Sequence, residues 1–249
     1  MGFKLSAGLR IGAVLALVFA VATGPREAAA DETAAFHQAV ASAAGHFREA
    51  AFYARRGNAT AAAFELEGLI EKWQNVEKAY GEKPPAVYAK DSQWRQTLAK
   101  VGERARASLA LIDDDKTKQA RDMVLPIRKL LSEMRKRNGV TTFSDCIDQA
   151  NAAFKRLFHF RRQPPNFDDS SQVADLKVRL ASTLDAYKVC SNAAPPQIAG
   201  DPQFQRLMKD SIYYLERMWV AIKEKNQLNV VNILRRVVSS DEILWLRFG

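Results

Sequence analysis

Apolar side chains return every third or fourth position along most of the chain, and this spacing constrains the fold more than any other feature. From Phe36, the apolar positions follow at steps of four and three residues through Val40, Ala43, Phe47 and Ala50. This period places the side chains on one face of an α-helix, whereas a half-buried strand requires alternation of polar and apolar residues. The sequence therefore predicts an all-α protein.

The same period predicts eight helices, separated by turns or by proline. We expect helices over about residues 34–56, 59–80, 91–113 and 116–137, one carrying the stripe that starts at Phe143, and further helices over about 170–190, 202–223 and 226–246. The helix over 59–80 is predicted to bury Phe64, Leu69, Trp73 and Val76. Pro126 should kink the helix that contains it, because proline removes one backbone hydrogen bond and clashes with the previous turn.

The second half of the chain repeats the pattern of the first. FHQAVASAAGHF at 36–47 aligns with FSDCIDQANAAF at 143–154, and PPAVYAKDSQW at 84–94 matches PPQIAGDPQF at 195–204 with one residue deleted. Similar segments in the same order indicate an internal duplication. We expect two tandem up-down-up-down four-helix bundles, residues 31–139 and 140–249, which are either separate or merged into one body.

The N-terminus has the layout of a secretory signal peptide. Two basic residues precede an uncharged apolar run over 11–23, and the AAA motif at 28–30 supplies the small residues that a signal peptidase requires. The run is shorter than the roughly 20 residues that span a membrane. We predict a cleaved signal peptide, residues 1–30, and a periplasmic or secreted protein with no transmembrane segment. Cleavage after the AVA motif at 20–22, or retention of the run as an anchor, are the alternatives.

Cys146 and Cys190 are the two cysteines of the chain. In an exported protein, two cysteines are most simply interpreted as one disulfide bond. The turn between the helices that carry them centres near Asp168, at equal sequence distance from both, so the two positions lie at the same level of an antiparallel hairpin. The sequence predicts a Cys146–Cys190 disulfide, because a redox or metal-binding pair usually shows closer spacing.

The predicted architecture and compartment resemble those of periplasmic four-helix bundles of the cytochrome c′ and b562 type. The sequence has no CxxCH motif, by which cytochrome c′ attaches haem, so covalent haem is not expected. His37 pairs in height with Met134, and His46 pairs with Met123, on the first and fourth predicted helices. These four residues are candidate ligands of a non-covalent haem. Packing explains the methionines equally well, because they fall at core spacings.

His46 and Glu49 lie three residues apart on one helical face, which makes them candidate metal ligands. A ferritin-like di-iron site requires a second Glu-x-x-His motif, which the sequence does not contain. The sequence also contains no GxSxG elbow and no glycine-rich phosphate loop. We therefore predict no catalytic residues and no cofactor.

The formal net charge is +9, and the basic residues are spread along every predicted helix, which disfavours nucleic acid as a partner. An acidic protein or an anionic lipid surface is the expected partner. The candidate residues for this surface are Arg128, Arg135, Lys136, Arg137, Arg161 and Arg162. Positive charge at a helix end also stabilises the helix dipole without any partner.

These features favour a periplasmic, non-catalytic binding or accessory protein that uses the surfaces of its helix bundles. The alternative is a periplasmic redox or metal/haem carrier of the cytochrome c′/b562 architectural type, without covalent haem.

Overall fold

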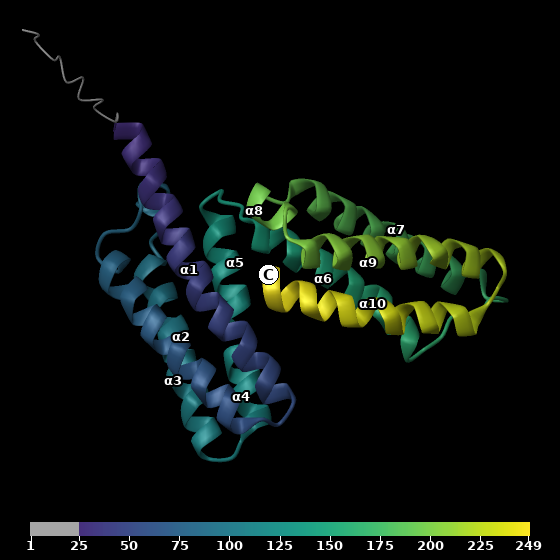
Figure 1. The fold of residues 1–249 in the computed structure, drawn as a ribbon, viewed down its shortest axis with the longest axis horizontal. Helices are drawn as coiled ribbons and strands as arrows, with labels where there is room; N and C mark the ends of the chain where they lie inside the picture. Colours follow the sequence, from purple (N-terminus) through teal and green to yellow (C-terminus); the bar gives the residue numbers. More distant parts are fainter. Residues whose placement is uncertain (1–24) are drawn as a thin grey trace, which may run out of the picture.

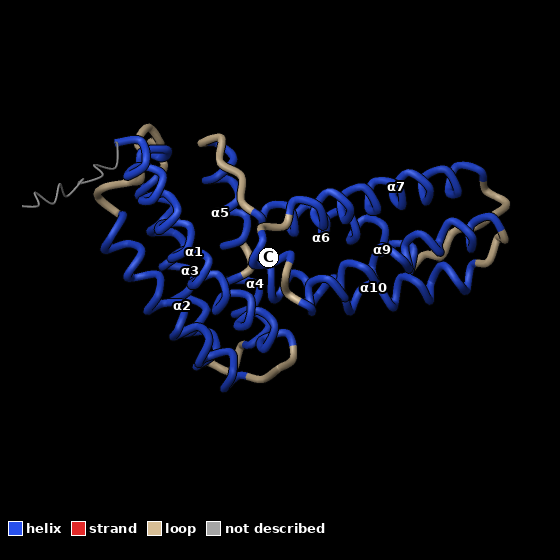
Figure 2. Tube along the Cα trace, turned by 45° about the horizontal axis from the view of Figure 1, so that its top comes forward, coloured by secondary structure: helices blue, strands red, loops and turns tan. Residues whose placement is uncertain are grey.

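The computed structural model of the protein describes residues 25–249. Every regular element in this range is a helix, and the range contains no strand (Figures 1 and 2). The predicted all-α class is therefore confirmed. None of the helices in this range is long and apolar enough to cross a membrane. The apolar run over 11–23, on which the signal-peptide prediction depends, lies outside the described residues.

The helices form two groups (Figure 1). The first group contains α1 (Pro25–Arg55), α2 (Ala59–Tyr80), the 3-10 helix η1 (Ala86–Tyr88), α3 (Trp94–Asp113), α4 (Thr117–Val124) and α5 (Ile127–Arg137). The second contains α6 (Phe143–Phe158), the 3-10 helix η2 (His159–Arg161), α7 (Ser170–Ala193), α8 (Pro196–Ala199), α9 (Pro202–Lys223) and α10 (Gln227–Phe248). The predicted ranges agree with these bounds within a few residues, except that α1 begins at Pro25.

Local sequence signals explain several of the helix ends. The predicted kink at Pro126 is a break, because α4 ends at Val124 and α5 begins at Ile127. The Asn58 side chain accepts a hydrogen bond from the backbone N–H of Ala61 and caps α2. Asp201 caps α9 in the same way, since its side chain accepts from the first backbone N–H groups of that helix. These caps fix where α2 and α9 begin.

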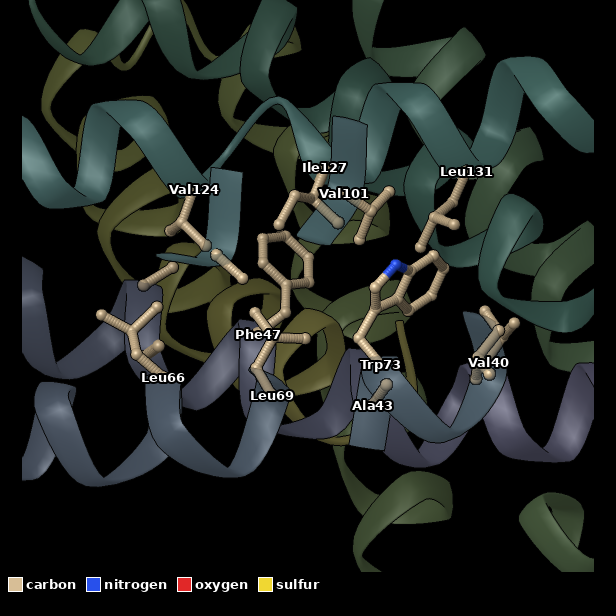
Figure 3. Packing of buried hydrophobic residues seen from close by; sticks show 14 of the residues in the cluster. Val40, Ala43, Phe47, Leu66, Leu69, Trp73, Val101, Val124, Ile127 and Leu131 are labelled. Atoms are coloured by element: carbon tan, nitrogen blue, oxygen red, sulfur yellow. The ribbon is translucent and has the colours of Figure 1, made fainter. Parts of the chain in front are cut away.

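The apolar side chains of α1 to α5 form one buried cluster (Figure 3). Phe47 on α1, Trp73 on α2 and Ile127 on α5 meet in this core. The indole N–H of Trp73 donates a 2.9 Å hydrogen bond to the carbonyl oxygen of Leu98 on α3, so its polar atom is satisfied inside the core. The core is therefore filled by side chains from all the long helices of the group.

The prediction that Phe64 is buried is wrong, because its side chain is 68% exposed. The buried stripe of α2 runs from Trp73 through Leu69 to Leu66 and Ala62. Phe64 is two residues from Leu66, which turns it by roughly 200° about the helix axis. The large apolar side chain of Phe64 favours the core, but the helical period places it on the opposite face of α2.

The second cluster of buried apolar side chains comes from α6, α7, α9 and α10. The disulfide Cys146–Cys190 joins α6 to α7 with its two Cα atoms 5.5 Å apart, which confirms the predicted pairing. The C-terminal residues also belong to this unit, because the ring of Phe248 packs edge-on against Phe204 with centroids 5.3 Å apart. The end of α10 reaches the place where the two helix groups meet (Figure 1).

Candidate functional site

A groove of about 410 Å³ lies where the two helix groups meet. Side chains from α1, α2 and the end of α10 line it, together with the residue that caps α9. Its polar residues include Ser42, His46, Glu49, Glu65, Asp201 and Arg247. We call this site the junction groove.

His46 is held in the junction groove by α2. Its Nδ1 atom lies 2.8 Å from the carboxylate of Glu65. The imidazole fits because position 68 is glycine, where a Cβ atom would come within 2.7 Å of the ring. The structure therefore pairs His46 with Glu65, whereas the sequence analysis had paired it with Glu49.

Arg48 fixes the end of α10 beside the junction groove. Its Nε atom donates a 2.9 Å hydrogen bond to the carbonyl oxygen of Leu246, and Nη1 donates to the carbonyl oxygen of Gly249. These carbonyls belong to the last turn of α10, where a cation is favourable. Burial lowers the pKa of Arg48 to about 10, so the guanidinium stays charged at neutral pH. The edge-on contact between Phe47 and Trp245 supports the same helix end.

Glu49 and Arg247 in the junction groove have no ion-pair partner within the described residues, whereas the carboxylate of Asp201 is occupied by the backbone N–H groups that it caps. Glu49 is half-buried on α1, and Arg247 is exposed on the last turn of α10. They bring opposite charges to the groove, so it can bind a polar group of either sign. Among residues 25–249, no cluster of three or more histidine, cysteine or acidic side chains is arranged to hold a metal ion.

The four candidate haem ligands have separate environments in the structure. His37 Nε2 lies 2.9 Å from the hydroxyl of Tyr88, and burial lowers the pKa of His37. His46 contacts Glu65, as described above. The Met123 sulfur accepts a 3.6 Å hydrogen bond from Arg104, and Met134 is buried in the first core. Contacts within the protein thus account for all four.

Three of the six basic candidates are used inside the molecule. Arg128 binds Asp148 and Asn151 on α6, and it stacks on Trp245 of α10. Arg135 is buried and holds Asp145 through two hydrogen bonds. Both arginines therefore join α5 to the second helix group, rather than facing a partner.

Arg137 binds Asp91 and the hydroxyl of Thr97, and so closes the end of the first helix group. The remaining candidates are exposed. Arg161 lies over the ring of Phe158, while Lys136 and Arg162 make no ion pair among the described residues. The basic surface that stays available is therefore located mainly at the end of α6.

Asp241 is a buried acid that the sequence analysis missed. Its carboxylate accepts a 2.6 Å hydrogen bond from the hydroxyl of Tyr187 and another from the amide of Asn151. Burial raises the pKa of Asp241 to about 6. A signal was present in the sequence, because Asp241 falls on the core stripe of α10 between Val237 and Leu244.

Comparison with known protein families, curated proteins and solved structures finds no match to this chain.

Proposed function

We propose that the protein is an exported, non-catalytic binding or accessory protein, and that the junction groove is one of its binding sites. The groove is the observation that carries this proposal, because its walls come from both helix groups and include the unpaired charges of Glu49 and Arg247. The two interiors, in contrast, are filled with apolar side chains. A partner would therefore bind at the surface of the protein.

We further propose that the two groups are four-helix bundles that arose by duplication, with α4 and α5 together serving as one broken helix. The buried positions of the last helix of each group support this. Counterparts lie at a constant offset of 110 residues: Ala120 and Val230, Val124 and Leu234, Ile127 and Val237, Leu131 and Asp241, Met134 and Leu244. The steps between these positions are those of the helical period, so the support comes from their place in the fold: both sets lie on the last helix of their group.

An aromatic contact at corresponding places in both groups supports the same proposal. Phe36 on α1 and Trp94 on α3 have ring centroids 5.1 Å apart. Phe143 on α6 and Phe204 on α9, their counterparts in the repeat, are 5.7 Å apart. The first contact packs α1 against α3, and the second packs α6 against α9.

Export to the periplasm or the cell exterior rests on the N-terminal sequence and on the disulfide. A bond between Cys146 and Cys190 persists in an oxidising compartment and is rare in the cytosol.

Site-specific photo-crosslinking in the native periplasm tests the binding function. A photoreactive residue is placed at Glu49 in the junction groove, and at exposed Lys100 on α3 as the control. We expect a discrete adduct from position 49 and none from position 100. Equal labelling from both positions, or no adduct from any surface position, would contradict the proposal.

The carrier alternative predicts a different result. Protein purified from its native periplasm would then show a Soret band or stoichiometric metal, held by His37, His46, Met123, Met134 or Glu49. We expect neither, because contacts within the protein already account for the histidines and the methionines. Absorbance and metal analysis of the same sample decide between the two functions.

A further inference from the structure

The first bundle holds the end of a helix on one face of α1. Arg55 forms a bidentate ion pair with Glu242 of α10, at 2.7 and 2.8 Å. About two turns earlier on α1, Arg48 donates to the last carbonyl oxygens of the same helix. Gly45 and Glu49 line the junction groove beside it. This face of α1 therefore recognises a helix C-terminus by two cations, one for a side-chain carboxylate and one for backbone carbonyls.

The second bundle carries the corresponding face on α6. The offset of 107 residues that aligns the two sequences places Lys155 at the position of Arg48, and Arg162 at the position of Arg55. Both cations of the α1 face are thus retained. Arg156 replaces Glu49, which makes the face of α6 more positive. We call the set Ala152, Lys155, Arg156, His159 and Arg162 the α6 face; its first three residues lie on α6, His159 begins η2, and Arg162 follows η2.

The α6 face is exposed at all five positions. A groove of about 350 Å³ runs beside it, between α6 and α7. Its residues correspond to those of the junction groove, since Gln149, Ala152, Ala153 and Arg156 align with Ser42, Gly45, His46 and Glu49. The end of α10 covers one side of the junction groove, but only α6 and α7 line the second groove within the described residues.

The second groove is lined by small side chains together with the polar Gln149, Ser182 and Asp185, and its concave shape suits a helix better than a flat lipid surface. Ala152, Ala153 and Ala186 allow a backbone to approach closely, and Val189 is 52% exposed at the edge. A membrane surface would use the positive charge but would not need a groove. The aromatic-basic run over 154–162, which the proposed function leaves unexplained, supplies the cations of this surface.

We propose that the α6 face docks the C-terminal end of a helix from a protein partner. The bound helix presents a carboxylate side chain seven residues before its last residue, as Glu242 stands before Gly249 in the contact on α1. The carboxylate pairs with Arg162, and the terminal carbonyl oxygens accept hydrogen bonds from Lys155. This inference rests on the proposed function, and it names one surface and one class of partner.

A peptide with the sequence of residues 236–249 is the probe, because it carries the helix end that α1 holds. Its fluorescein-labelled form is titrated with the intact, oxidised protein, and binding is followed by fluorescence anisotropy. We expect Arg156→Glu/Arg162→Glu to weaken binding at least about tenfold, since each reversal replaces attraction by repulsion. Lys100→Glu/Lys118→Glu, which reverses two exposed charges on the first bundle, is the matched control and should bind as the unmodified protein does.

A charge swap provides the stricter test. A peptide that carries Glu242→Lys should bind poorly to the unmodified protein and regain affinity for the Arg162→Glu variant. Circular dichroism establishes that each variant retains its helical fold. Rescue by the swap supports a direct contact between Arg162 and the carboxylate. If the variant bound poorly because its fold was damaged, changing the charge of the peptide would not restore the affinity.

Three results would overturn the proposal. The first is equal affinity of the α6-face and control variants. The second is loss of binding in Arg55→Glu but not in the α6-face variant, which would place the peptide on α1. The third is absence of peptide binding while phosphatidylserine vesicles bind through Arg156 and Arg162, which would make the surface a membrane contact. In each case an adduct from position 49 would leave the proposed function standing.

Discussion

Two buried aspartates near the junction differ in what surrounds them. Burial opposes ionisation of Asp145, but the hydrogen bonds from Arg135 outweigh it and lower the pKa of this carboxyl. Asp241 receives hydrogen bonds only from the neutral groups of Tyr187 and Asn151, with Lys155 and Arg128 more distant, and burial raises its pKa to about 6. A cation in direct contact decides which acid stays charged.

The raised pKa of Asp241 predicts how stability changes with pH. The folded state holds this proton up to about pH 6, whereas the unfolded chain releases it near pH 4. The free energy of unfolding should therefore fall as pH rises from about 4 to 6 and then level off. Between pH 4.5 and 7, unmodified protein should lose about 2 kcal/mol relative to Asp241→Asn. Urea unfolding at both pH values measures this, and parallel pH profiles of the two proteins would refute it.

A second prediction concerns Arg135, which is buried and binds Asp145 inside the protein. Replacing it by alanine leaves Asp145 buried without its cation, which typically costs about 3–5 kcal/mol. The neighbouring Lys136 is exposed, and Lys136→Ala should change stability by less than about 0.5 kcal/mol. Equal effects in urea unfolding would show that the pair does not hold α5 to α6.

The sequence placed Arg135 and Lys136 in one basic surface because they are adjacent. It could not separate them, since the partner of Arg135 lies on a helix whose direction is set by tertiary packing.

At the scale of elements, the apolar period predicted the helices well. The predicted ranges 59–80 and 202–223 coincide with α2 and α9, and proline correctly marked the break between α4 and α5. Errors arose where local signals were weak. The short helix α8 was not predicted, because four residues contain too little of a period to detect. Phe64 was misplaced by its residue type.

The hairpin of α6 and α7 yields a prediction about the disulfide. The bond joins residues with a sequence separation of 44. By the chain-entropy relation, closing a loop of this length stabilises the folded state by about 4 kcal/mol. Cys146→Ala/Cys190→Ala should lower the free energy of unfolding by about this amount, as should reduction of the unmodified protein. A double variant that unfolds at the same urea concentration as the oxidised protein would disprove it.

For the whole molecule, the sequence indicated two units but not how they meet. The junction depends on single contacts such as Arg48 with Leu246, and Arg55 with Glu242, between residues far apart in the chain. Such contacts leave no periodic signal, so the junction groove could not be predicted as a site. The spacing of His46 and Glu49 places them on one helical face, but nothing in the sequence shows that the end of α10 forms the opposite wall of the groove.

Arg48 should control how firmly the two helix groups are joined. Arg48→Met keeps the apolar bulk of the side chain but leaves the last carbonyl oxygens of α10 without their donor. We expect faster amide exchange over residues 245–249 and red-shifted emission from Trp245, with the helices of the first group still protected. Unchanged exchange at the end of α10 would show that Arg48 is not needed for the junction. Exposed Arg235→Met on the same helix is the control.

Only one of the two units carries a covalent cross-link, and this asymmetry matters for production of the protein. In the reducing cytosol of an expression host, the bond would not persist, so the C-terminal unit would lose this cross-link, while the N-terminal unit contains no cysteine and does not depend on one. Routing the chain through an oxidising compartment would preserve the cross-link.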